Sequence, residues 1–169
     1  MSEAGWLPPL VLLEESGGVW EAYEEVLYGW FRKDFVTSKP RWPRQRVGLK
    51  RYPLEKGKEA TFWHFISEGD TEADRTIDMR RCERLRWPRP AMEKFTSRRP
   101  VIGDPVVWWR NQRRNEWRYL VALPDFSYLV VIADRGDYVL PWTQYVVERE
   151  HQREKYRKEY QTYWDAPKS

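Results

Sequence analysis

The stretch Asp125–Tyr160, DFSYLVVIADRGDYVLPWTQYVVEREHQREKYRKEY, decides the predicted fold. Residues 128–133 and 138–147 are rich in β-branched and aromatic side chains, a composition typical of buried strands. The turn between them contains Gly136, which favours a tight reversal of the chain. Pro141 is compatible with the second strand only at a sheet edge or a bulge. The stretch therefore predicts an antiparallel hairpin.

Composition changes sharply after this hairpin. From Glu148 to Tyr160, ten of the thirteen residues are charged or histidine, and none is Gly, Pro or β-branched. Tyr156, Tyr160 and Trp164 recur at helical spacing. The pattern predicts a solvated helix that packs through one aromatic stripe.

The chain before the hairpin begins with a helical region. Apolar residues between Val19 and Trp30 recur at helical spacing and predict an amphipathic helix that ends near Asp34. A proline-broken basic loop follows over residues 37–46. Six more elements are expected: strands over 47–52 and 61–67, a helix capped by Asp74 or Asp78 and running to Leu85, a short helix over 91–95, and strands over 105–110 and 116–123.

These elements define the predicted fold class as α+β, with N-terminal helices, a four-stranded antiparallel sheet and a C-terminal helix. The length of 169 residues and the 41% hydrophobic fraction suit one globular unit. Within that unit, residues 1–46 are expected to form the helical segment and basic loop, and residues 47–169 the α+β domain.

Residues that bind metals or form disulfides are scarce. Cys82 is the single cysteine and the chain has two histidines, so no disulfide, metal site or cofactor is expected. No run of eighteen apolar residues exists, so no membrane contact is predicted. Residues 7–13 are apolar but contain two prolines and lack a basic leader, unlike a signal peptide. We therefore expect a cytoplasmic protein.

The net charge of +4 is modest, but the basic residues are concentrated. Residues 39–51 contain six Lys or Arg and no acid, and residues 75–99 contain nine against three acids. If these segments converge in the fold they form a phosphate-binding surface, and if they do not they are ordinary solvated faces. The eleven Trp and ten Tyr allow base stacking but also fill cores.

No nucleotide-binding loop, serine-hydrolase elbow or zinc-protease motif is present. What remains is His64 within an aromatic segment, an arginine-rich segment after it, and hydroxyl groups on a later strand. RNA cleavage needs only such groups, because the 2′-OH attacks its own phosphate when side chains move protons and hold the charge. The alternatives are a core or stacking role for His64, a surface position for His151, and arginines that are solvated or paired with Glu83.

Four segments together resemble a known family: GKEATFWHFISEG (57–69), RRCERLRWPRP (80–90), DFSYLVVIADRGDYVLPWTQYVVE (125–148) and HQREKYRKEY (151–160). The chain is similar through them to prophage and mobile-element proteins of the barnase–EndoU–colicin–RelE-like nuclease group. The resemblance implies an N-terminal helical part followed by a four-stranded antiparallel sheet, so that residues 47–169 would form a nuclease-like α+β domain. The activity that it implies is metal-independent RNA cleavage.

The resemblance also implies roles for individual residues. His64 would transfer a proton, Arg84 and Thr143 would complete the catalytic set, and Gln144 departs from the small residue expected after the Thr. Arg81 and Arg84 would contact phosphate, with His151 and Lys155 nearby on the helix. Arg86 and Arg46, which belong to the two basic segments, are expected to bind nucleic acid as well. Alternation along the strand predicts that Thr143 and Tyr145 face solvent while Trp142 and Val146 face the core.

The function predicted on this basis is a metal-independent endoribonuclease that leaves 2′,3′-cyclic phosphate ends, acting as a prophage effector or toxin. Its partners would be RNA and an antitoxin or another phage or host protein. A non-catalytic RNA- or protein-binding module of phage origin uses the same basic and aromatic surface and stays open as the alternative. A scaffold protein whose aromatic residues are all in the core is the third.

Overall fold

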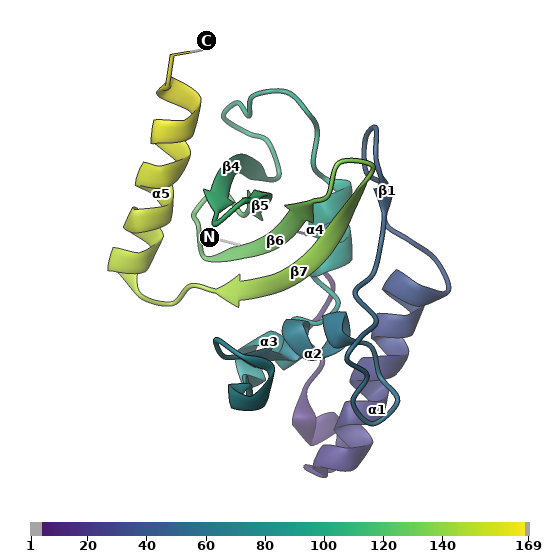
Figure 1. The fold of residues 1–169 in the computed structure, drawn as a ribbon. Coiled ribbons are helices and arrows are strands. Elements are labelled where there is room, and N and C mark those ends of the chain that lie inside the picture. The colour runs from purple at the N-terminus through teal and green to yellow at the C-terminus, as the bar shows by residue number, and fades with distance from the viewer. Residues whose placement is uncertain (1–4, 168–169) are drawn as a thin grey trace.

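The hairpin around Gly136 lies inside a five-stranded sheet in the computed structural model, which describes residues 5–167 (Figure 1). The strand order is β1-β7-β6-β5-β4. The strands are β1 (Arg46–Val47), β4 (Val107–Arg113), β5 (Glu116–Ala122), β6 (Tyr128–Asp134) and β7 (Tyr138–Val146). A second, two-stranded sheet pairs β2 (Ser67–Glu68) with β3 (Thr76–Ile77).

Helices and short helical turns make up the rest of the fold. The main helices are α1 (Trp20–Phe31), α2 (Ala60–Ile66), α3 (Met79–Glu83), α4 (Pro88–Glu93) and α5 (Glu150–Asp165). The turns are η1 (Leu13–Ser16), η2 (Arg32–Val36), which continues α1, and η3 (Glu72–Asp74). The α+β class is therefore confirmed.

The predicted four-stranded antiparallel sheet is correct for β4 to β7 but incomplete. A fifth strand, β1, pairs in parallel with the start of β7, through Arg46 with Tyr138 and Val47 with Val139. Because β1 has only two residues, the second half of β7 stays at the sheet edge. This edge is where α2 and α3 pack.

The prediction of a strand over 61–67 is wrong, because Ala60–Ile66 is the helix α2. All seven of its residues are buried, so the segment shows neither the alternation of a half-buried strand nor the apolar stripe of a surface helix. Its β-branched and aromatic composition suggested a strand, and packing from all sides overrides that preference.

The strand predicted over 47–52 is also mostly wrong, because pairing with β7 ends after Gly48. The carbonyls of Lys50 and Arg51 instead accept hydrogen bonds from the first amides of α2, Thr61 and Ala60, at 3.0 and 3.1 Å. The segment thus satisfies donors that the beginning of a helix leaves unpaired.

Several local predictions are confirmed. Asp78 caps α3 by accepting from the amides of Arg80 and Arg81, and the short helix expected over 91–95 is present as α4, which begins earlier, at Pro88. Pro141 lies at a register shift in the β6–β7 pairing, the bulge that a proline in a strand requires. The predicted stripe of α5 packs on the sheet, with Tyr156 and Tyr160 about 6 Å from the ring of Trp109.

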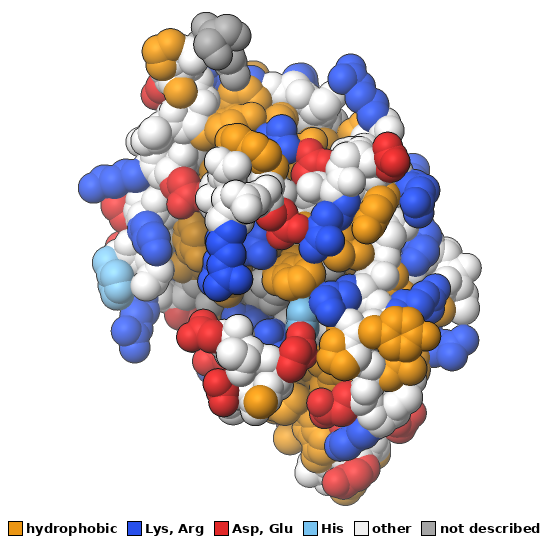
Figure 2. All heavy atoms as spheres, viewed as in Figure 1, with side chains coloured by type: hydrophobic (Ala, Val, Ile, Leu, Met, Phe, Trp, Pro, Cys, Tyr) orange, Lys and Arg blue, Asp and Glu red, His pale blue; other side chains and the backbone are white. Residues whose placement is uncertain are grey.

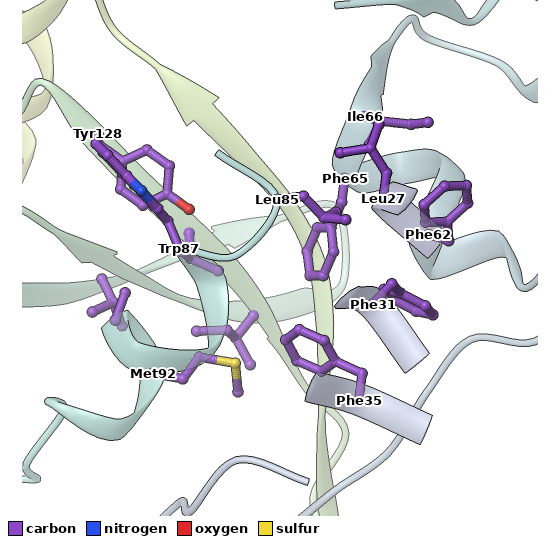
Figure 3. Packing of buried hydrophobic residues seen from close by; sticks show 14 of the residues in the cluster. Leu27, Phe31, Phe35, Phe62, Phe65, Ile66, Leu85, Trp87, Met92 and Tyr128 are labelled. Atoms are coloured by element: carbon purple, nitrogen blue, oxygen red, sulfur yellow. The ribbon is translucent and has the colours of Figure 1, made fainter. Parts of the chain in front are cut away.

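The two faces of the sheet have separate cores. One face packs against α1, α2 and α4, where aromatic rings from α1 and η2 meet rings from α2, as in Phe31 against Phe62 at 5.5 Å between ring centroids (Figure 3). This core includes side chains from both of the segments that the sequence analysis separates after residue 46. The opposite face, around Trp109 and Leu129, is covered by α5 over only part of its width.

Candidate functional site

A cleft of about 580 Å³ opens between the uncovered part of this second face and the β2–β3 hairpin. Figure 2 looks onto this side of the molecule, where basic and acidic side chains gather around a hollow. The lining residues are His64, Glu68, Gly69, Asp70, Thr71, Glu72, Arg75, Arg81, Arg113, Arg114, Glu116, Arg118, Trp142, Thr143 and Tyr145. We call this the central cleft.

His64 and Glu72 form a hydrogen bond at the wall of the central cleft. The Nε2 atom of His64 lies 2.8 Å from Oε1 of Glu72. The His64 side chain is only 4% exposed, whereas that of Glu72 is 50% exposed. Since a carboxylate only accepts, a neutral His64 ring carries its proton on Nε2, and Nδ1 is the basic nitrogen.

Burial lowers the pKa of His64 below its ordinary value, and the nearby charge of Arg75 acts in the same direction. The hydrogen bond and the charge of Glu72 oppose this lowering without cancelling it. Burial alone would raise the pKa of Glu72, but His64 and Arg75 outweigh it and lower that pKa. At pH 7 the pair is therefore an ionised carboxylate beside a neutral imidazole.

Polar side chains from other elements fix the backbone that carries His64. The last carbonyls of α2 lack helical partners. The carbonyl of His64 accepts from the hydroxyl of Thr143 at 2.8 Å and the carbonyl of Phe65 accepts from Gln144 Nε2 at 2.9 Å. The carbonyl of Ile66 accepts from the amide of Asp78 at 2.9 Å. The edge of β7 thus positions the end of α2.

Arg75 and Arg81 supply the positive charge inside the central cleft. Both guanidinium groups donate to the carbonyl of Ser67, and Arg75 also donates to the Ser67 hydroxyl at 2.8 Å. Arg81 is 5% exposed, and its Nη2 lies 3.9 Å from a Glu68 carboxylate oxygen. These arginines hold the hairpin in place and act on the cleft chiefly through their charge.

The prediction that Thr143 faces solvent is wrong, because it is 5% exposed and its hydroxyl is hydrogen-bonded. The bulge around Trp142 resets the alternation of the strand, so Trp142 and Thr143 both line the central cleft. Gln144, the departure from the family pattern, is fully buried. It links Phe65, Arg81 and Tyr128 through three hydrogen bonds.

Aromatic rings and exposed arginines complete the central cleft. The Trp142 ring centroid lies 5.0 Å from that of His64, and the Arg81 guanidinium lies 4.9 Å from the centroid of the Tyr145 ring. At the tip of the β4–β5 hairpin, Arg113 and Arg114 are exposed. Neither has an acidic partner within residues 5–167. Together these groups offer stacking surfaces and phosphate contacts.

The other residues proposed from the sequence lie elsewhere. Arg84 lines a separate cavity, with its guanidinium 5.0 Å from the Trp87 ring centroid. Arg86 stacks on Trp30 at 3.8 Å, and Arg46 on Tyr138 at 5.0 Å. His151 and Lys155 are exposed on α5 and do not line the central cleft. The structure brings together His64, Arg81 and Thr143.

Sequence reasoning did not single out Glu72 or Arg75, and it named Tyr145 only as a solvent-facing residue on the strand of Thr143, without a role in the chemistry. Glu72 lies in a polar loop, and no motif marks it as the partner of His64, eight residues earlier. Arg75 is the first residue of the basic segment 75–99, and its place in that segment was the one sequence feature that could have pointed to a role in the site.

Within residues 5–167, no three His, Cys, Asp or Glu side chains are grouped as metal ligands, and no helix is long and apolar enough to cross a bilayer. No family model, curated protein or solved structure matches this chain. The resemblance to the nuclease group therefore stays a prediction, and the chemistry of the central cleft has to be judged from its own residues.

Proposed function

We propose that this chain binds single-stranded RNA in the central cleft and cleaves it by attack of the ribose 2′-OH on the neighbouring phosphate. The observation that carries the proposal is the buried His64, hydrogen-bonded to the half-exposed Glu72, in a cleft with arginine charge inside and exposed arginines on its rim. This arrangement combines a proton acceptor, positive potential and stacking surfaces in one place.

His64 acts as the general base. Its lowered pKa keeps the imidazole neutral at pH 7, and Glu72 holds the tautomer whose Nδ1 accepts a proton. The 2′-oxygen gives its proton to His64 and forms a bond to phosphorus. The bond from phosphorus to the 5′-oxygen of the next nucleotide breaks, which leaves a 2′,3′-cyclic phosphate.

The leaving 5′-oxygen requires a proton, and Tyr145 supplies it in this scheme. Its ring lies in the central cleft beside Arg81, and its hydroxyl takes part in no hydrogen bond among the described residues. Arg75 and Arg81 stabilise the charge that develops on the phosphorane chiefly through their fixed positive field, since most of their donors are already bound to backbone and side-chain oxygens. The exception is Nε of Arg81, which is buried and has no hydrogen-bond partner among the described residues.

The experiment that tests this function compares a single-stranded RNA with a DNA of the same sequence. The RNA should be cut and the DNA should stay intact, because only RNA carries the attacking 2′-OH. Binding of both without cleavage would replace the nuclease proposal by the binding-module alternative. Absence of salt-dependent binding to either would contradict both.

The pH dependence of cleavage reports on His64. Because the base form is required and burial lowers its pKa, kcat/KM should rise with pH and level off with an inflection below 6.5. Glu72→Gln removes an interaction that raises this pKa, so the inflection should move to still lower pH. The control is Glu116→Gln, in the same cleft but paired with Arg118 and Arg135, and it should leave the inflection in place. An inflection above 6.5 would contradict the role of His64.

The salt dependence of binding reports on the rim arginines. Replacing Arg113 and Arg114 together by Ala should reduce the magnitude of the log Kd against log salt slope by roughly 1.4, since each contact to a single strand contributes about 0.7. Arg86→Ala is the control and should leave the slope unchanged, because Arg86 stacks on Trp30 away from the central cleft. Fluorescence anisotropy with a labelled RNA measures both. An unchanged slope in the double variant would show that RNA does not contact this hairpin.

A further inference from the structure

A second cavity, of about 460 Å³, lies on the other side of the β2–β3 hairpin. Its wall includes Trp20 from α1, Trp63 from α2, and Leu54 and Lys56 from the loop before α2. Glu72 and Arg75 line both this cavity and the central cleft. The two hollows are therefore neighbours that meet at the partner of His64.

The aromatic walls of this second cavity are held in fixed positions. Trp63 Nε1 donates to the carbonyl of Glu55 at 3.1 Å, and Trp20 Nε1 donates to Glu24 at 3.1 Å. Leu54 is 49% exposed at the mouth of the cavity. Lys56 Nζ lies 5.9 Å from the centroid of the Trp63 ring. Flat apolar surfaces beside a cation suit a nucleobase attached to a phosphate backbone.

We infer that this second cavity holds the base of one of the two nucleosides that flank the scissile phosphate, while the central cleft holds the other. The inference rests on the proposed function, because cleavage at a phosphodiester always involves a nucleoside on each side. Glu72 and Arg75 mark where the two hollows meet, and His64 bonds to Glu72 there. A phosphate beside this junction has one hollow on either side of it.

The assignment also explains a costly surface feature. Leu54, which lines the cavity, is 49% exposed and presents apolar surface to water in a wall that also includes two tryptophans. Exposed apolar groups that adjoin a formed cavity are typical of ligand-binding sites. Charged side chains of both signs, Glu24 and Lys56, pair at 3.6 Å in the same wall and leave it without a strong net charge.

Equilibrium binding tests the inference without requiring cleavage. The probes are 2′-O-methyl tetranucleotides, either intact or with one abasic residue on the 5′ or the 3′ side of the central phosphate. Trp20→Ala and Leu54→Ala should each weaken binding of the intact probe, by about tenfold for the tryptophan. One of the two abasic probes lacks the base that the second cavity would hold, and the same substitutions should not change the affinity for that probe. Trp117→Ala is the control, since Trp117 is 45% exposed on β5 and lines neither hollow.

Each outcome decides one question. The inference is supported if the substitutions weaken binding of the intact probe but not of the probe that is abasic at one flanking position. Cleavage of the matching RNA then tests the proposed function separately. Equal weakening of the intact and both abasic probes, or no weakening by either variant, would overturn the inference even if RNA is cleaved. Leu54→Ala keeps the test valid if Trp20→Ala does not fold, because Leu54 is half exposed and leaves the core unchanged. Binding of a protein partner at this cavity, with no effect on oligonucleotides, would also overturn it.

Discussion

Replacing His64 by Ala is expected to lower the rate of RNA cleavage by roughly 10²- to 10⁴-fold, the range that general acid–base groups contribute. The physical reason is that His64 is the buried imidazole in the central cleft and that its lowered pKa keeps it in the base form. Single-turnover cleavage of a labelled RNA measures the effect, and anisotropy measures binding of the same RNA in parallel. Binding should change by no more than about threefold, because the phosphate contacts lie on the rim.

His64→Gln separates catalysis from folding, because its amide can still donate to Glu72 while no basic nitrogen remains. It should be as inactive as His64→Ala but closer to wild type in thermal stability. His151→Ala is the matched histidine control, exposed on α5 outside the central cleft, and should cleave at the wild-type rate. Wild-type cleavage by folded His64→Gln would remove His64 from the mechanism.

The second large effect is on stability. Gln144→Leu is expected to reduce the free energy of unfolding by about 3 kcal/mol, since a buried group left unpaired costs about 1–3 kcal/mol and two groups lose their partner. These are the hydroxyl of Tyr128 and the carbonyl of Phe65, whereas the carbonyl of Arg81 still accepts from the amide of Arg84. Urea denaturation monitored by tryptophan fluorescence measures the change.

Gln112→Leu provides the control for this substitution. Gln112 is on β4 and exposed, so the same change of side chain should alter the free energy of unfolding by less than about 0.5 kcal/mol. If Gln144→Leu costs as little as Gln112→Leu, the three hydrogen bonds do not hold the ends of α2 and α3 against β7.

The parts of the fold with strong local patterns were predictable. The hairpin of β6 and β7 has β-branched strands and a glycine turn, and α5 has an aromatic stripe on a charged helix. Asp78 and Pro88 begin helices for reasons that depend only on neighbouring residues.

The parts of the fold that depend on tertiary contacts were not predictable from the sequence. Every residue of α2 is buried, so the pattern contained no information on its periodicity. The parallel pairing of β1 depends on residues about ninety positions apart in the chain. The orientation of Thr143 depended on where the bulge beside Pro141 falls, which sequence alternation does not locate.

The candidate site was predicted in part for the same reasons. His64, Arg81 and Thr143 meet because α2 and α3 both pack on the edge of β7. Arg84 was grouped with Arg81, three residues earlier. However, α3 ends at Glu83, and the Arg84 side chain lies against Trp87 instead. Glu72 could not be identified, since a glutamate in a polar loop is an ordinary feature until the fold places it beside an imidazole.

The most direct test of the central claim is the chemical identity of the ends produced from a single-stranded RNA by the purified wild-type protein. Mass spectrometry of the fragments distinguishes attack by the ribose 2′-OH from cleavage that leaves 3′-hydroxyl and 5′-phosphate ends. Attack by the ribose 2′-OH predicts 2′,3′-cyclic phosphate on one fragment and a 5′-hydroxyl on the other, with both absent from reactions of His64→Gln. Intact RNA, or fragments that end in 3′-hydroxyl and 5′-phosphate, would contradict the account.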